Sequence, residues 1–161
     1  MTDDVMQDSD PLSAPYTLSD WSLIICERSG IWGSRLRSAL GDDLALMCET
    51  RSVAECLSEF EHFPAGLGIV ETTHKNVESV LGLLWTLDRR FPLAQVILFA
   101  ARGLESLEML SRELGAAHFV AIPPRDLRPV IDIIQRHRAA LPEPRRSLTE
   151  QILAGLPWGE D

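Results

Sequence analysis

The sequence has no long apolar run and no basic residue near its beginning. No stretch approaches the roughly 18 apolar residues that a membrane-spanning helix needs, and residues 1–20 carry five Asp without one Lys or Arg. A secretory signal starts with basic residues and continues with an apolar core, so neither a signal peptide nor a membrane span is expected. These absences predict a cytoplasmic protein whose 161 residues form one domain with tails.

Cysteine and histidine are also few, and neither follows the spacing of a ligand set. The three cysteines, Cys26, Cys48 and Cys56, are an odd number without a CxxC pair, which argues against a disulfide framework. The four histidines have no zinc spacing. We therefore expect no cofactor and no metal site built on these residues. Cys26 is a candidate nucleophile or redox sensor, but with no His near it in the sequence we expect a small buried hydrophobic residue.

A glycine-rich phosphate-binding fingerprint and an extended basic region are missing as well. The net charge of −9 comes mainly from residues 1–20 and 147–161, so the sequence between them is close to neutral. Acidic tails on a neutral domain argue against nucleic acid and membranes as partners. The basic residues of 136–138 and 145–146 are expected to meet the acidic tails or an acidic partner. The polar residues 72–75 are interpreted as a solvated loop.

What the sequence does contain is five short apolar runs that alternate with helical patterns. The expected strands cover 21–26, 44–48, 67–70, 95–100 and 117–122, and the expected helices cover about 31–40, 52–63, 76–90, 104–114 and 126–141. This alternation predicts an α/β domain of the flavodoxin-like (βα)5 type, a doubly wound parallel sheet of order 2-1-3-4-5 in three α/β/α layers. The first and third strands end side by side in such a sheet, which places Glu71 at the mouth of any site.

Three segments follow from the composition. Residues 1–17 are rich in Asp, Ser and Pro and are predicted to be disordered. Residues 18–141 form the domain, and 142–161 form a Pro-rich linker with a short amphipathic segment. That segment contains Leu156 and Trp158, and it either docks on the domain or binds another protein. The 20 residues after Leu141 are too few for a DNA-binding output domain, so none is expected.

The pattern over about residues 20–141 resembles the receiver domain of two-component response regulators. Residues 115–124, GAAHFVAIPP, are similar to the family's GA-x-x-[FY]-x-x-KP in all but the lysine, with Phe119 at the aromatic position. The resemblance implies the flavodoxin-like fold and a role in bacterial signal transduction. It also implies an interaction surface on the last strand and its neighbouring helices, with Phe119 as a candidate residue.

The positions that carry a receiver's chemistry hold other residues here. By resemblance, Cys26 and Glu27 replace the acidic pair that holds Mg²⁺, Glu71 replaces the phosphate-accepting aspartate, Ala100 replaces a Thr or Ser, and Ile122 replaces the lysine before Pro123. Thr73 completes this degenerate pocket. Phosphoryl transfer needs an acceptor at the right reach, a metal ion and groups that bind the transferred phosphoryl. The departures together imply a pseudo-receiver that is not an enzyme.

Three hypotheses stay open at this point. The first is a non-catalytic regulatory module that binds another signalling protein or a second copy of itself, with Glu71 imitating a phosphorylated aspartate. The second is a working receiver with atypical residues. The third is a small-molecule-binding flavodoxin-like domain or enzyme. Glu27 and Glu71 are weak candidate ligands for a divalent ion, and a solvated carboxylate at a strand end is the simpler interpretation of Glu71.

Overall fold

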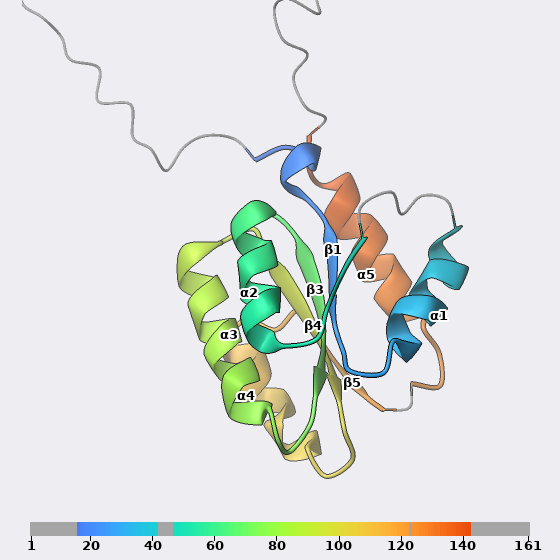
Figure 1. Ribbon diagram of the computed structural model, residues 1–161, viewed down its shortest axis with the longest axis vertical. Coiled ribbons are helices and arrows are strands. Elements are labelled where there is room, and N and C mark those ends of the chain that lie inside the picture. Colours follow the sequence, from blue (N-terminus) through green and yellow to red (C-terminus); the bar gives the residue numbers. More distant parts are fainter. Residues whose placement is uncertain (1–15, 42–46, 123, 143–161) are drawn as a thin grey trace, which may run out of the picture.

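The computed structural model describes residues 16–41, 47–122 and 124–142, which form a five-stranded parallel sheet with helices on both faces (Figure 1). Its elements are η1 (Leu18–Asp20), β1 (Leu23–Cys26), α1 (Ile31–Leu40), β2 (Met47–Thr50), α2 (Val53–His62), β3 (Leu67–Thr72), α3 (Val77–Arg90), β4 (Gln95–Ala100), η3 (Glu105–Leu107), α4 (Glu108–Glu113), β5 (His118–Ala121) and α5 (Arg128–Ala139). The strand order β2-β1-β3-β4-β5 confirms the predicted doubly wound fold. None of the described helices is long and apolar enough to cross a membrane.

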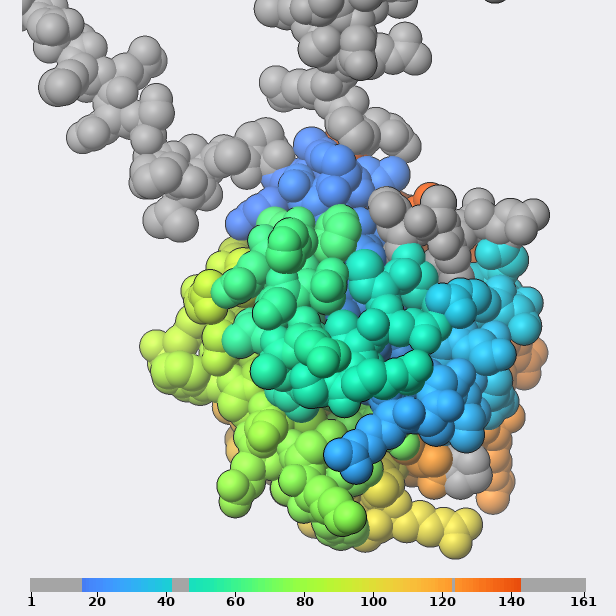
Figure 2. All heavy atoms as spheres, viewed as in Figure 1, coloured from blue at the N-terminus to red at the C-terminus, as the bar shows by residue number. Residues whose placement is uncertain are grey.

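The helices divide into two layers around the sheet. α2, α3 and α4 cover one face, and α1 and α5 cover the other (Figure 1). In the space-filling view α2 and α3 hide most of the face that they cover (Figure 2). Phe60 of α2 anchors the core on one side of the sheet, and Trp32 and Leu36 of α1 anchor it on the other. β1 is buried along its whole length, which explains its uninterrupted apolar run.

The register of the central strands positions the candidate site. Cys26, the last residue of β1, lies beside Val70 of β3. β3 continues past this point with Glu71 and Thr72, which pair with the end of β4. The carboxyl end of the sheet therefore presents the turn after β1 next to the last residues of β3.

The second strand differs from the prediction. Residues 44–46 of the expected run lie outside the described residues, and β2 does not end at Cys48 but continues through Glu49 to Thr50. Thr50 pairs with Cys26, and its hydroxyl donates a hydrogen bond to the Ile25 carbonyl at 3.2 Å. β2 is an edge strand of this sheet, so its polar residues can take part in the ladder while Glu49 stays exposed.

The helix predicted over 104–114 is divided. It begins as the 3₁₀ turn η3 and becomes α-helical only in the short α4. A continuous α-helix would line one side with Leu104, Leu107, Leu110 and Leu114. A 3₁₀ turn has fewer residues per turn than an α-helix, so these residues do not stay on one side. Leu104 is buried, but Leu110 is 41% exposed, and Ser111 is buried in its place.

The apolar spacing of α3 predicts that Val80, Leu84, Trp85 and Leu87 are among its buried residues, and Trp85 departs from this prediction. The stripe that faces the sheet contains Val80, Leu84 and Leu87 as expected, whereas Trp85 is 52% exposed. The Arg89 guanidinium lies 4.2 Å from the centre of the Trp85 ring. Such cation–π stacking covers part of an exposed aromatic ring.

Candidate functional site

A cleft of about 470 Å³ opens where β1 and β3 end. Its lining residues are Cys26, Glu27, Arg28, Glu71, Thr73, His74, Lys75 and Asn76. The location agrees with the rule that doubly wound sheets bind ligands beyond the carboxyl ends of their strands, at the switch point. Four of the residues singled out in the sequence therefore meet at one site: Cys26, Glu27, Glu71 and Thr73.

Glu27 is used to begin α1. Its side chain is only 2% exposed; Oε2 accepts a hydrogen bond from the Trp32 N–H at 2.9 Å, and Oε1 accepts one from the Gly33 N–H at 2.7 Å. The residue that precedes α1, Gly30, has no side chain with which to cap these groups and takes a φ of +76°. The carboxylate thus satisfies N–H groups that a helix leaves unpaired, at the end where its dipole favours negative charge.

A second carboxylate approaches the same helical turn. A Cβ at Gly33 would lie 2.9 Å from Glu49 Oε1 and 3.2 Å from Glu27 Oε1, so the close approach of both depends on glycine at this position. Arg37 and Arg51 contact the Glu49 carboxylate at 2.8 and 3.6 Å. Arg51 also donates to the Glu27 carbonyl at 3.1 Å. Glu49 is not among the predicted site residues, because the predicted second strand, 44–48, ends before it.

Glu71 has a much looser environment than Glu27. It is half-buried, and its Oε2 accepts a hydrogen bond from the Arg28 N–H at 3.2 Å. Its backbone is held by Asn76, which donates from Nδ2 to the Glu71 carbonyl at 2.9 Å and accepts from the Thr73 N–H at 2.7 Å. The short loop after β3 is therefore fixed by one amide side chain, while the Glu71 carboxylate borders the cleft.

The segment 72–75 is not a uniform solvated loop. Thr72 is the buried last residue of β3, and Thr73, His74 and Lys75 form a wall of the cleft. His74 Nε2 donates to the Arg102 carbonyl at 3.0 Å, which joins this wall to the loop after β4. The cleft thus carries two carboxylates and the cationic side chains of Arg28 and Lys75, a mixture that the sequence did not reveal.

Ala100 and Ile122, which replace a Thr or Ser and a lysine of the receiver pattern, have only apolar side chains. Ala100 is buried at the end of β4. Ile122 packs on the core cluster that contains Trp32 and Phe99, and neither Ala100 nor Ile122 is among the described residues that line the cleft. Pro123, Leu156 and Trp158 lie outside the described residues. Phe119 is a half-buried residue of β5, packed against the core on the side of α3 and α4.

Cys26 is a wall residue of the cleft and is 4% exposed. A hydrogen bond with the Cys56 thiol of α2 lowers the pKa of Cys26, and the Thr50 hydroxyl acts in the same direction. The same thiol pairing, together with burial, raises the pKa of Cys56. The predicted burial of Cys26 is confirmed, and its pairing with Cys56 could not be read from the sequence.

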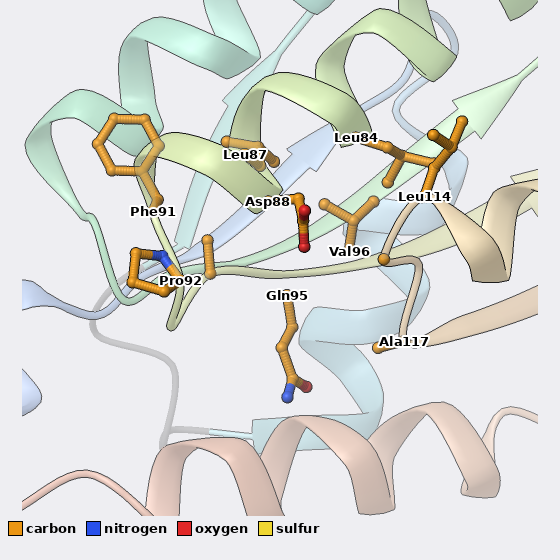
Figure 3. A pocket seen from close by; sticks show the side chains of 11 residues that line it. Leu84, Leu87, Asp88, Phe91, Pro92, Gln95, Val96, Leu114 and Ala117 are labelled. Carbon is orange, nitrogen blue, oxygen red and sulfur yellow. The ribbon is translucent and has the colours of Figure 1, made fainter.

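A second cleft lies at the opposite end of the sheet. It has a volume of about 220 Å³ and lies at the amino ends of β4 and β5; Leu84, Leu87, Phe91 and Leu114 line it together with Asp88 (Figure 3). Beside it, the Trp21 indole donates to His137 Nδ1 at 3.0 Å, and His137 Nε2 donates to the Leu93 carbonyl at 2.9 Å. Burial lowers the pKa of His137. These contacts connect α5 to the segments that precede β1 and β4.

The fold, with a cleft between the ends of β1 and β3, defines a doubly wound α/β domain of the receiver type. No protein-family model and no curated protein matches the sequence. Solved structures do. A receiver domain of a response regulator from Bacteroides fragilis has a TM-score of 0.60 at 16% identity, covering 73% of this chain and 96% of that one. A response regulator from Thermotoga maritima has a TM-score of 0.61 at 18% identity, covering 74% and 98%.

A third similar structure is the CheY-like protein tadZ from Pseudomonas aeruginosa, with a TM-score of 0.57 at 18% identity, covering 73% of this chain and 98% of that one. At such identities the similarity establishes the fold. The chain therefore has the receiver fold, and its function is inferred from its own site.

Proposed function

We propose that this protein is a pseudo-receiver, a non-enzymatic regulatory domain that acts through protein–protein contact without a phosphorylation cycle. The observation that carries the proposal is the environment of Glu27, both of whose carboxylate oxygens bind the backbone of α1. Its neighbour Cys26 offers a thiol where the resemblance places a carboxylate. The end of β1 therefore has no free acidic group for Mg²⁺, the ion that neutralises charge in phosphoryl transfer.

The rest of the site supports the same proposal. A receiver would need a hydroxyl at Ala100 and a cation at Ile122, and both are apolar side chains turned to the core. Glu71 presents a carboxylate where the resemblance places the phosphate acceptor. Its carboxylate accepts a hydrogen bond from the Arg28 N–H, and it can imitate the charge of a phosphorylated aspartate and keep the domain in one state.

The interaction surface that we propose lies on α4, β5 and α5. β5 is an edge strand of the described sheet, and Met109 and Leu110 of α4 are 74% and 41% exposed. Phe119 lies on β5 between these helices. The segment with Leu156 and Trp158 is a further candidate for contact. The partner is another signalling protein or a second copy of this chain, in the cytoplasm, and the acidic charge of −9 disfavours nucleic acid and membranes.

The test is a titration with beryllium fluoride and Mg²⁺, a phosphoryl mimic, followed by tryptophan fluorescence. Trp32 is a suitable reporter because its backbone N–H donates a hydrogen bond to Glu27. Its ring also packs edge to face against Phe99, with the ring centroids 5.0 Å apart. We expect no saturable change that depends on Mg²⁺, under conditions in which an ordinary receiver responds. Saturable, Mg²⁺-dependent binding would support the atypical working receiver.

One observation favours a second candidate, a small-molecule-binding domain. The volume of the cleft, about 470 Å³, falls within the range of roughly 300–1,000 Å³ that is usual for ligand sites. This alternative predicts that the purified protein retains a ligand. Native mass spectrometry would show the ligand as a fixed added mass. The fraction of the protein that carries this mass should decrease when Glu71 or Lys75 is replaced by Ala.

A further inference from the structure

The three thiols differ in their access to the cleft. Cys26 is the one that lines it. Cys56 is fully buried in α2 and belongs to the same core cluster as Cys26, and each thiol shifts the pKa of the other, which places the two sulfurs next to each other. Cys48 lies one position before Glu49 on β2 and contacts the Ser22 hydroxyl at 3.4 Å. One end of the Cys26–Cys56 pair therefore faces the cleft, and the other end is enclosed by the protein.

We propose that Cys26 and Cys56 form a reversible redox pair at the wall of this cleft. Hydrogen peroxide that enters the cleft oxidises Cys26, and Cys56 is the resolving thiol. This function goes beyond the signalling role proposed above and does not depend on it.

The reaction proceeds in two balanced steps. The Cys26 sulfur attacks one peroxide oxygen and the O–O bond breaks; this gives a sulfenic acid at Cys26, and the second oxygen leaves as water with the thiol proton. The Cys56 sulfur then attacks the sulfur of Cys26, the S–S bond forms, and the S–O bond breaks. The hydroxyl group leaves as water with the Cys56 proton. In total, two thiols and one peroxide give a disulfide and two waters, and a dithiol reverses the oxidation.

The surroundings of the pair fit this division of roles. The neighbouring Cys56 thiol lowers the pKa of Cys26, and the thiolate is the reactive form. Glu71 and Glu55 are near enough to act against that negative charge. Hydrogen peroxide is small and uncharged, so it can enter a cleft that carries both carboxylates and cationic side chains. Cys48 has no second thiol beside it and serves as an internal comparison.

The test uses the full-length reduced protein under native conditions. It is treated with hydrogen peroxide, its remaining thiols are alkylated, and intact mass and peptide mapping are recorded. We expect a loss of two hydrogen atoms, a Cys26–Cys56 link, an alkylated Cys48, and full reversal by a dithiol. Cys48→Ser should behave like the wild type. In Cys56→Ser the reaction should stop at a sulfenic acid on Cys26, which dimedone captures.

Several results would overturn the proposal. They are a link that involves Cys48, stable sulfinic acid at Cys26 without a link, or three thiols that stay unmodified in the folded protein. The peptide map of the oxidised wild-type protein decides between these outcomes even if Cys56→Ser does not fold. Circular dichroism shows whether that variant is folded before its reaction is compared.

Discussion

The ends of β1 and β3 are neighbours in the sheet. Glu27 directly follows β1, Glu71 is the second-last residue of β3, and the protein uses these two glutamates differently. Glu27 is buried and bound to two backbone N–H groups, whereas Glu71 is half-exposed with one longer hydrogen bond. The difference follows from the turns. α1 begins at Ile31, so its first turn lies against Glu27, while α3 begins only at Val77 after a loop that Asn76 holds. The segment that follows a strand therefore decides whether a glutamate near the end of that strand supports the fold or borders a site.

The largest expected effect is that of Glu27→Ala. The change leaves the buried N–H groups of Trp32 and Gly33 without a partner, and we expect it to lower the free energy of unfolding by about 2–3 kcal/mol. Urea unfolding followed by circular dichroism measures this loss.

The matched control is Glu71→Ala, which removes an equal side chain from the neighbouring strand end. We expect it to lower the free energy of unfolding by less than about 1 kcal/mol, because the Glu71 carboxylate is partly exposed and its hydrogen bond from the Arg28 N–H is longer than those of Glu27. Equal losses in the two variants would show that the turn after β1 does not depend on Glu27 for its helix cap.

A smaller effect is expected at the loop after β3. Asn76→Ala removes the hydrogen bonds to the Thr73 N–H and the Glu71 carbonyl, and we expect a loss of about 1–2 kcal/mol together with faster amide exchange over 73–76. Lys75→Ala, in the same loop but exposed, should change stability by no more than about 0.5 kcal/mol. Similar exchange rates in both variants would mean that the loop is held by other contacts.

The beginning of β1 offers a comparison at the opposite end of the sheet, with an effect that depends on pH. Burial lowers the pKa of His137 below its ordinary value of 6.5, so the unfolded chain takes up this proton more readily than the folded one. The stability that the neutral ring contributes is present above pH 6.5 and is lost as the pH falls through the lower folded pKa.

His137→Gln removes this titration, and urea unfolding of both proteins at a series of pH values measures it. We expect the stability advantage of the wild type over the variant to shrink as the pH falls. An advantage that is constant or grows towards low pH would show that His137 does not favour its neutral form in the folded protein. Trp21 and Leu93, which bind the two ring nitrogens, are unchanged in both proteins.

Most of the fold could be predicted from the sequence, because the spacing of the apolar residues and the polar breaks between the apolar runs agree with the observed strands and helices. The run from Gln95 to Ala100 is a strand in the prediction and in the structure, since a continuous apolar run between polar breaks suits a strand buried on both faces. β2 ends two residues later than predicted, because an edge strand can contain polar residues such as Glu49 and Thr50. The helix after β4 was mispredicted because a 3₁₀ turn changes its period.

The candidate site could be predicted only in part. Parallel strands bring Cys26, Glu27 and Glu71 to one end of the sheet, so their proximity follows from the fold. The cap that Glu27 makes depends on how α1 leaves the turn, which no spacing in the sequence specifies. The pairing of Cys26 with Cys56 depends on the packing of α2 against the sheet, and thirty positions separate the two residues in the chain.

The most direct test of the pseudo-receiver proposal is phosphorylation by a small-molecule donor. The full-length protein is incubated with acetyl phosphate and Mg²⁺ beside an ordinary receiver, and intact masses are compared over time. We expect the mass of this protein to stay unchanged while the ordinary receiver gains a phosphoryl group. A stoichiometric gain of one phosphoryl group that requires Mg²⁺ and disappears in Glu71→Gln would contradict the proposal, because it would make Glu71 a working acceptor.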